Sequence, residues 1–100
     1  MQFIINGPLK DNVYNSIRRV GYYFLGKNDR TGEVSAVRPF SGDDYPRFHL
    51  YVKIENDGMI FNLHLDQKKP SYEGYAAHAG EYSGEIIEKE AERIKQTLQK

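Results

Sequence analysis

The segment RFHLYVKIENDGMIFNLHLD, residues 47–66, decides the fold of this chain. It contains two runs in which apolar and polar residues alternate, separated by the dipeptide Asp57-Gly58. Alternation with a period of two is typical of strands that bury one face, and Asp-Gly favours a two-residue hairpin turn. The segment therefore predicts an antiparallel β-hairpin.

A turn centred on Asp57-Gly58 also predicts which residues of this hairpin face each other. On the apolar face, it pairs Leu50 with Leu65, Val52 with Leu63, and Ile54 with Phe61. On the polar face, it pairs His49 with Asp66, Tyr51 with His64, Lys53 with Asn62, and Glu55 with Ile60. Apolar residues then meet apolar residues, whereas a slip by one residue would place them against polar ones.

A second hairpin is expected before this one. Tyr22–Leu25 and Glu33–Arg38 are rich in aromatic and β-branched residues, and the segment GKNDRTG between them has the composition of a turn. Phe3–Ile5 is either a further short strand or an apolar lead-in. The sequence thus predicts four or five strands.

Two helices complete the predicted elements. The first begins near Pro8 and ends at Gly21, because proline suits a first helical turn and glycine the end of a helix. The second follows Ser83, whose side chain can cap it, and it has leading acidic residues and trailing lysines, as the helix dipole prefers. The apolar stripes consist of Leu9, Val13, Ile17 and Val20 in the first helix and of Ile87, Ala91, Ile94 and Leu98 in the second.

Together these segments predict a single α+β domain over residues 1–100, with the element order (β)-α-β-β-β-β-α. Because each helix has one apolar stripe, both helices are expected to pack on one face of a four- or five-stranded antiparallel sheet. The other sheet face is then open, or is covered by the long segment after the last strand. A chain of 100 residues is long enough for one modest hydrophobic core.

The composition narrows the functional classes. The chain has no cysteine, which removes disulfides, zinc–thiolate sites and thiol catalysis. Fourteen basic residues balance fourteen acidic ones, so the overall positive charge of a non-specific nucleic-acid binder is missing. Neither a signal-peptide pattern nor an apolar run of about 20 residues is present, so we expect a cytoplasmic protein without membrane contact.

The polar face of the hairpin carries the candidate site. In the predicted register His49 and Asp66 are opposed, with His64 diagonal to them and Tyr51 beside them. Two imidazoles and a carboxylate would therefore share one patch of the sheet surface, although the chain separates His49 widely from the other two residues.

The connection between Gln67 and Gly84 can extend this patch. It is long for a compact domain, and its small-residue stretch AAHAGEY contains His78 and Glu81. Imidazoles and carboxylates are the ligands that zinc-like divalent metals take when no thiolate is available. If the connection folds over the polar face, the predicted metal ligands are His49, His64, Asp66, His78 and Glu81.

Catalysis is the runner-up interpretation of the same residues. His49 and Asp66 could act as an acid–base pair in a hydrolase, or the metal ligands could hold an ion that activates water. Ser71 and Ser83 could supply a hydroxyl, but turn and capping roles explain both more simply. No metalloprotease, EF-hand, phosphate-loop or serine-hydrolase motif is present. The simplest alternative is that the histidines and Asp66 are ordinary solvent-exposed strand residues.

The leading expectation is a binding module for a divalent metal or a small polar ligand. The predicted ligand-binding residues beside the histidines are Tyr51, Lys53, Asn62, Lys68, Lys69 and Tyr72. With Arg47, these cations and aromatic rings would also suit single-stranded nucleic acid, although nearby acidic residues dilute the positive charge. A homodimer through an edge strand or the open sheet face is a third class, because 13 of the residues are aromatic and some must be exposed.

Overall fold

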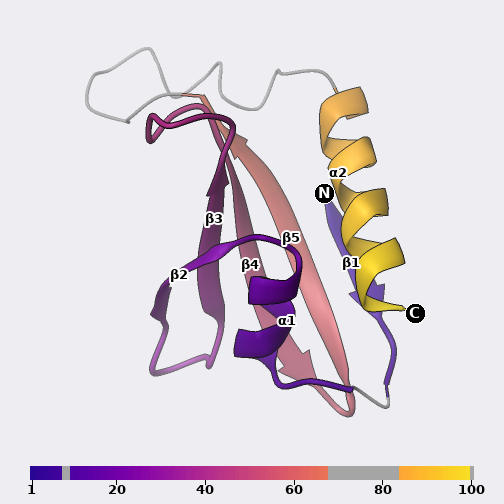
Figure 1. The fold of residues 1–100 in the computed structure, drawn as a ribbon. Coiled ribbons are helices and arrows are strands. Elements are labelled where there is room, and N and C mark those ends of the chain that lie inside the picture. Colours follow the sequence, from indigo (N-terminus) through magenta and orange to yellow (C-terminus); the bar gives the residue numbers. More distant parts are fainter. Residues whose placement is uncertain (8–9, 68–83, 100) are drawn as a thin grey trace.

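The computed structural model describes residues 1–7, 10–67 and 84–99. Its elements follow the order β-α-β-β-β-β-α and form a five-stranded antiparallel sheet with two helices (Figure 1). The strands are β1 (Gln2–Ile5), β2 (Tyr23–Lys27), β3 (Val34–Pro39), β4 (Arg47–Glu55) and β5 (Gly58–Asp66), and the helices are α1 (Val13–Arg19) and α2 (Gly84–Leu98). The predicted α+β class is confirmed. Among the described residues, neither helix is long and apolar enough to cross a membrane.

The strand order across the sheet is β1-β5-β4-β3-β2. The β4–β5 hairpin therefore lies inside the sheet, while β1 and β2 form its two edges. The sequence predicted Phe3–Ile5 to be either a short strand or an apolar lead-in. This segment belongs to β1 and pairs with β5. Phe3 lies opposite Phe61 there, and their rings stack with centroids 5.1 Å apart.

The hydrophobic core lies between one sheet face and the helices. Alternate strand residues point into it, and they meet Ile17 of α1 together with Ala91 and Ile94 of α2. Figure 1 shows both helices on the same side of the sheet. The apolar stripe predicted for the second helix is thus the stripe that packs, with Ile87 and Leu98 partly buried at its ends.

Helix α1 is shorter than the sequence predicted. It begins after Asn12, whose side chain accepts a hydrogen bond from the backbone N–H of Asn15 at 2.8 Å. It ends before Gly21, which has a φ of 91°, so the prediction of glycine at this end was correct. The expected start near Pro8 is wrong, because residues 10–12 are not helical. Pro8 and Leu9 themselves lie outside the described residues, as does the predicted cap Ser83.

The register of the β4–β5 hairpin differs from the prediction by two residues. Leu50 pairs with Leu63 instead of Leu65, and the same shift applies along the whole hairpin. A shift by two keeps every side chain on its face of the sheet, so the apolar pattern is satisfied in both registers. Alternation therefore predicted the two faces correctly, and could not distinguish the two registers.

The turn of this hairpin consists of Asn56 and Asp57, because Glu55 pairs with Gly58. Asn56 has a φ of 58°, a left-handed conformation that asparagine adopts more readily than most residues. Gly58 has a different role from the predicted one: a Cβ atom there would lie 2.8 Å from the carbonyl oxygen of Ile5. Glycine therefore permits the end of β1 to approach the start of β5. The sequence predicted Ile54, next to the turn, to lie in the core. Its side chain is instead 46% exposed.

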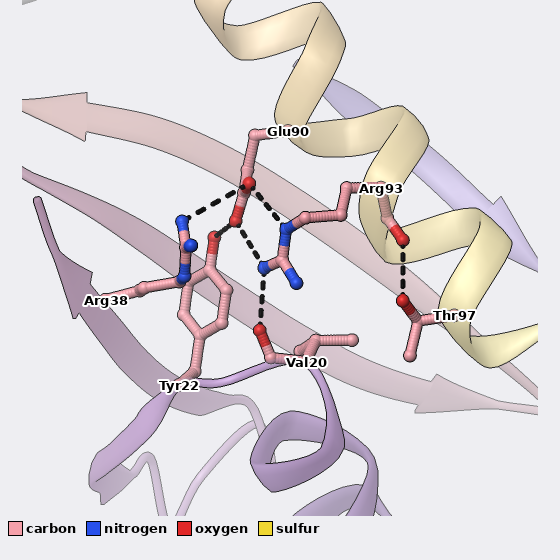
Figure 2. A network of polar contacts seen from close by, with 6 residues as sticks. All are labelled: Val20, Tyr22, Arg38, Glu90, Arg93 and Thr97. Carbon is pink, nitrogen blue, oxygen red and sulfur yellow. Dashed lines mark hydrogen bonds and ion pairs between the residues drawn. The ribbon is translucent and has the colours of Figure 1, made fainter.

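A buried polar network joins α2 to the β2–β3 side of the molecule (Figure 2). The carboxylate of Glu90, only 5% exposed, accepts a hydrogen bond from the Tyr22 hydroxyl at 2.5 Å. Arg93 donates to both carboxylate oxygens at 2.8 and 2.9 Å, and to the carbonyl oxygen of Val20 at 2.6 Å. Arg38 of β3 adds an ion pair at 3.5 Å. The buried charge is thus compensated on several sides.

Candidate active site

The sheet face opposite the helices carries the polar cluster expected from the sequence. His49 on β4 and Asp66 on β5 contact each other, with His49 Nδ1 3.0 Å from Asp66 Oδ2. The contact is diagonal, because the register pairs His49 with His64 and Asp66 with Arg47. The proximity of His49 and Asp66 is therefore confirmed, but their predicted direct pairing is wrong.

Ser35 of β3 is a further member of this cluster, and the sequence did not predict it. Its Oγ lies 2.7 Å from His49 Nε2. Ser35 faces away from the core because its neighbours Val34 and Ala36 are buried in it. In the pairing of β3 with β4, Ser35 lies opposite Tyr51, and its side chain reaches His49 diagonally. We refer to Ser35, His49 and Asp66 as the Ser–His–Asp chain.

The chemistry of the groups determines the direction of the bond to Asp66 and, for a neutral imidazole, also that of the bond to Ser35. An ionised carboxylate can only accept, so His49 Nδ1–H donates to Asp66. In the neutral imidazole Nε2 then has a free lone pair, and it accepts from the Ser35 hydroxyl. A hydroxyl bonded to a base that a third group orients is the usual arrangement of an activated nucleophile.

Neighbouring side chains hold the Ser–His–Asp chain in place. Arg47 Nε donates to Asp66 Oδ2 at 3.3 Å, so this oxygen has both His49 and Arg47 as partners. The guanidinium of Arg47 in turn lies 4.4 Å from the centre of the Tyr45 ring. The imidazole of His49 is 14% exposed and stacks on Tyr51, with ring centroids 4.4 Å apart. These contacts restrict the rotation of both ends of the His49–Asp66 pair.

His64 and Tyr51 differ from His49 in their electrostatic surroundings. Partial burial, the N-terminal ammonium group and His49 lower the pKa of His64, so its ring is neutral near pH 7. Burial, Asp66 and Glu33 raise the pKa of Tyr51, so its phenol keeps its proton. The rings of His64 and Tyr51 meet edge to face, with their centroids 5.6 Å apart.

The metal site expected from the sequence has no support in the described part of the chain. Residues 1–7, 10–67 and 84–99 contain no group of three or more His, Asp or Glu side chains arranged to hold a metal ion. Both ring nitrogens of His49 are already engaged, by Ser35 and by Asp66. The other two predicted ligands, His78 and Glu81, lie outside the described residues.

Three of the predicted ligand-binding residues, those on β4 and β5, lie close together on one face of the sheet. Tyr51 pairs with Asn62, and Lys53 is exposed on the same face of β4. The remaining predicted residues, Lys68, Lys69 and Tyr72, lie outside the described residues, as does Ser71.

Comparison with known proteins adds no functional assignment. No protein-family model matches the chain, and no curated protein has significant sequence similarity to it. Nucleic-acid binding, a homodimer and a cytoplasmic location stay predictions.

Proposed function

We propose that the sheet face opposite the helices is the active site of a hydrolase, with His49 as its general base and Asp66 as the group that orients this base. One observation carries the proposal: His49 Nδ1 contacts the carboxylate at 3.0 Å while Nε2 contacts a hydroxyl at 2.7 Å. Both distances are within the range in which an imidazole can move a proton between a nucleophile and a leaving group. This observation favours the acid–base interpretation of the sequence over the metal-binding one.

Each residue of the pair has a defined part in this chemistry. His49 Nε2 takes a proton from the attacking hydroxyl group and later gives it to the leaving group. The imidazolium that forms between these steps lies beside the negative charge of Asp66, which stabilises it. Arg47 holds the Asp66 carboxylate and so positions the imidazole indirectly.

The position of the pair on the sheet suits this role. The side chain of Asp66 is 29% exposed and that of His49 is 14% exposed, so both are partly shielded without being closed off. Partial shielding strengthens the electrostatic interaction between them relative to a fully solvated pair. A substrate can approach from the face that the described helices leave uncovered (Figure 1).

Ester hydrolysis by wild-type and variant proteins tests the proposal. We expect saturable hydrolysis of p-nitrophenyl esters of short carboxylic acids at pH 8. His49→Gln should lower kcat/KM by about 100-fold or more, the usual contribution of a general base, and Asp66→Asn should lower it in the same direction. Addition of EDTA should leave the rate unchanged; a loss that zinc restores would instead favour the metal-assisted form of the reaction.

His64→Gln is the matched control for this experiment. His64 lies directly opposite His49 on the same face and is more exposed, so it measures the background reaction of a surface imidazole with activated esters. We expect this variant to retain the wild-type rate. Equal losses in His49→Gln and His64→Gln, or no loss in His49→Gln, would contradict the proposal.

A further inference from the structure

We propose that Ser35 is the nucleophile of this site and that its substrates are carboxylic esters, whose acyl group it accepts as a covalent Ser35 ester. This inference rests on the proposed function. It adds a residue that forms and breaks bonds, and it names the class of bond that is cleaved.

The geometry that supports it is the path of the Ser–His–Asp chain across the sheet. β3, β4 and β5 are neighbours in the strand order, and each contributes one member of the chain. Ser35 Oγ lies 2.7 Å from His49 Nε2, inside the range expected for a nucleophile and its base. Central strands hold all three residues, so their spacing is defined by backbone hydrogen bonds and not by a loop.

The other described serines do not share this environment. Ser16 is buried in α1 at 3% exposure, on the helix side of the sheet. Ser41 is exposed and follows the end of β3. Ser35 is half-buried, and its hydroxyl is hydrogen-bonded to an imidazole that a carboxylate orients. A serine whose hydroxyl is bonded to an oriented imidazole is more nucleophilic than an ordinary surface serine.

The reaction balances without an added co-reactant other than water. Ser35 Oγ forms a bond to the carbonyl carbon of the ester, and its proton passes to His49 Nε2. The carbon–oxygen bond to the alcohol then breaks, and the alcohol leaves with that proton. Water attacks the acyl group, His49 takes a proton from the water, and Ser35 is released with this proton. The products are the carboxylic acid and the alcohol.

A fluorophosphonate probe, which reacts with activated serines, tests this inference on the full chain. We expect one adduct per chain by intact mass, located on Ser35 by fragmentation of the labelled peptide. His49→Gln should slow labelling by about 100-fold or more, because the base is then missing. Because the wild-type adduct is mapped directly, this result does not depend on the folding of a variant.

Two serine variants complete the experiment. Ser35→Ala should abolish both labelling and ester hydrolysis, while the control Ser41→Ala should retain both. An adduct on any other residue, or labelling that is equally fast in His49→Gln, would overturn the assignment of Ser35.

The failure of this inference is distinguishable from the failure of the proposed function. If hydrolysis requires His49 but survives in Ser35→Ala, and no adduct forms, then His49 acts on water and only the nucleophile assignment is overturned. If neither hydrolysis nor labelling occurs in the wild-type protein, both proposals are overturned.

Discussion

His49 and His64 face each other on adjacent strands, yet their surroundings differ. Both ring nitrogens of His49 have a side-chain partner, and its ring stacks on Tyr51. His64 is exposed, and its ring and the Tyr51 ring meet edge to face. One residue type therefore has two roles on one face: His49 is oriented for proton transfer, and His64 is a neighbouring surface group.

His64 gives the protein a pH-dependent term in its stability. Its pKa is lower in the folded protein than the ordinary value of about 6.5, so the unfolded chain binds a proton more readily. As the pH falls below about 6.5, this protonation favours unfolding, until the pH reaches the folded pKa and the term becomes constant. We expect His64→Asn to lose less stability than the wild type between pH 7.5 and pH 5.

Urea unfolding of both proteins across this pH range measures the difference. The informative quantity is the change in the free energy of unfolding with pH, since a substitution can alter its absolute value for other reasons. A steeper acid-side loss in His64→Asn than in the wild type would show that His64 is more easily protonated in the folded state, contrary to this account.

At the scale of elements, the Glu90 network fixes α2 to the rest of the molecule. Glu90 and Arg93 come from α2, Val20 follows α1, and Tyr22 precedes β2 (Figure 2). Burial and the nearby Glu90 carboxylate raise the pKa of Tyr22, so its hydroxyl keeps its proton and serves as the donor. The helix is thus held by specific hydrogen bonds in addition to its apolar stripe.

Tyr22→Phe should lower the free energy of unfolding by about 1–3 kcal/mol, the range for a lost hydrogen bond to a buried charged group. The ring remains to fill the core, so the loss reports on the hydroxyl. Tyr23→Phe is the matched control, because Tyr23 is the next residue and is 69% exposed. The free energies of unfolding of the two variants, measured by chemical denaturation, should differ by this amount, and equal values would show that the Tyr22 hydroxyl adds nothing.

The elements also show how far the sequence could predict the fold. Alternation in β4 and β5 identified the two faces of the hairpin, because a period of two directly reflects which side is buried. It could not identify the register, because a shift by two residues satisfies the same pattern. The start of α1 was missed for a related reason: apolar spacing continued to Leu9, whereas Asn12 caps the helix later.

The candidate site was predictable only within one hairpin. His49 and Asp66 lie on strands joined by a two-residue turn, so their proximity follows from local pattern and turn chemistry. Ser35 comes from β3, and its position beside His49 depends on the long-range pairing of β3 with β4. The only local signal was a polar residue between the buried Val34 and Ala36, which indicates an outward side chain but not its neighbour.

At the scale of the whole molecule, the fold separates its stabilising layer from its chemical surface. Both helices lie on one side of the sheet (Figure 1), where they cover the hydrophobic core, and the Ser–His–Asp chain lies on the other side. Its three members lie on the inner strands β3, β4 and β5, each with a hydrogen-bonded neighbour on both sides. Substitutions of the Ser–His–Asp chain can therefore alter reactivity with little change to the core.

The central claim is that His49 bridges Ser35 and Asp66 as a base whose orientation is fixed. Long-range ¹H–¹⁵N NMR of the labelled protein at pH 8 tests this claim most directly, because it shows which ring nitrogen carries the proton. We expect His49 with its proton on Nδ1, a lone pair on Nε2, and a slowly exchanging Nδ1 proton that Asp66→Asn removes or shifts. A proton on Nε2 with a bare Nδ1, unchanged by Asp66→Asn, would contradict the claim.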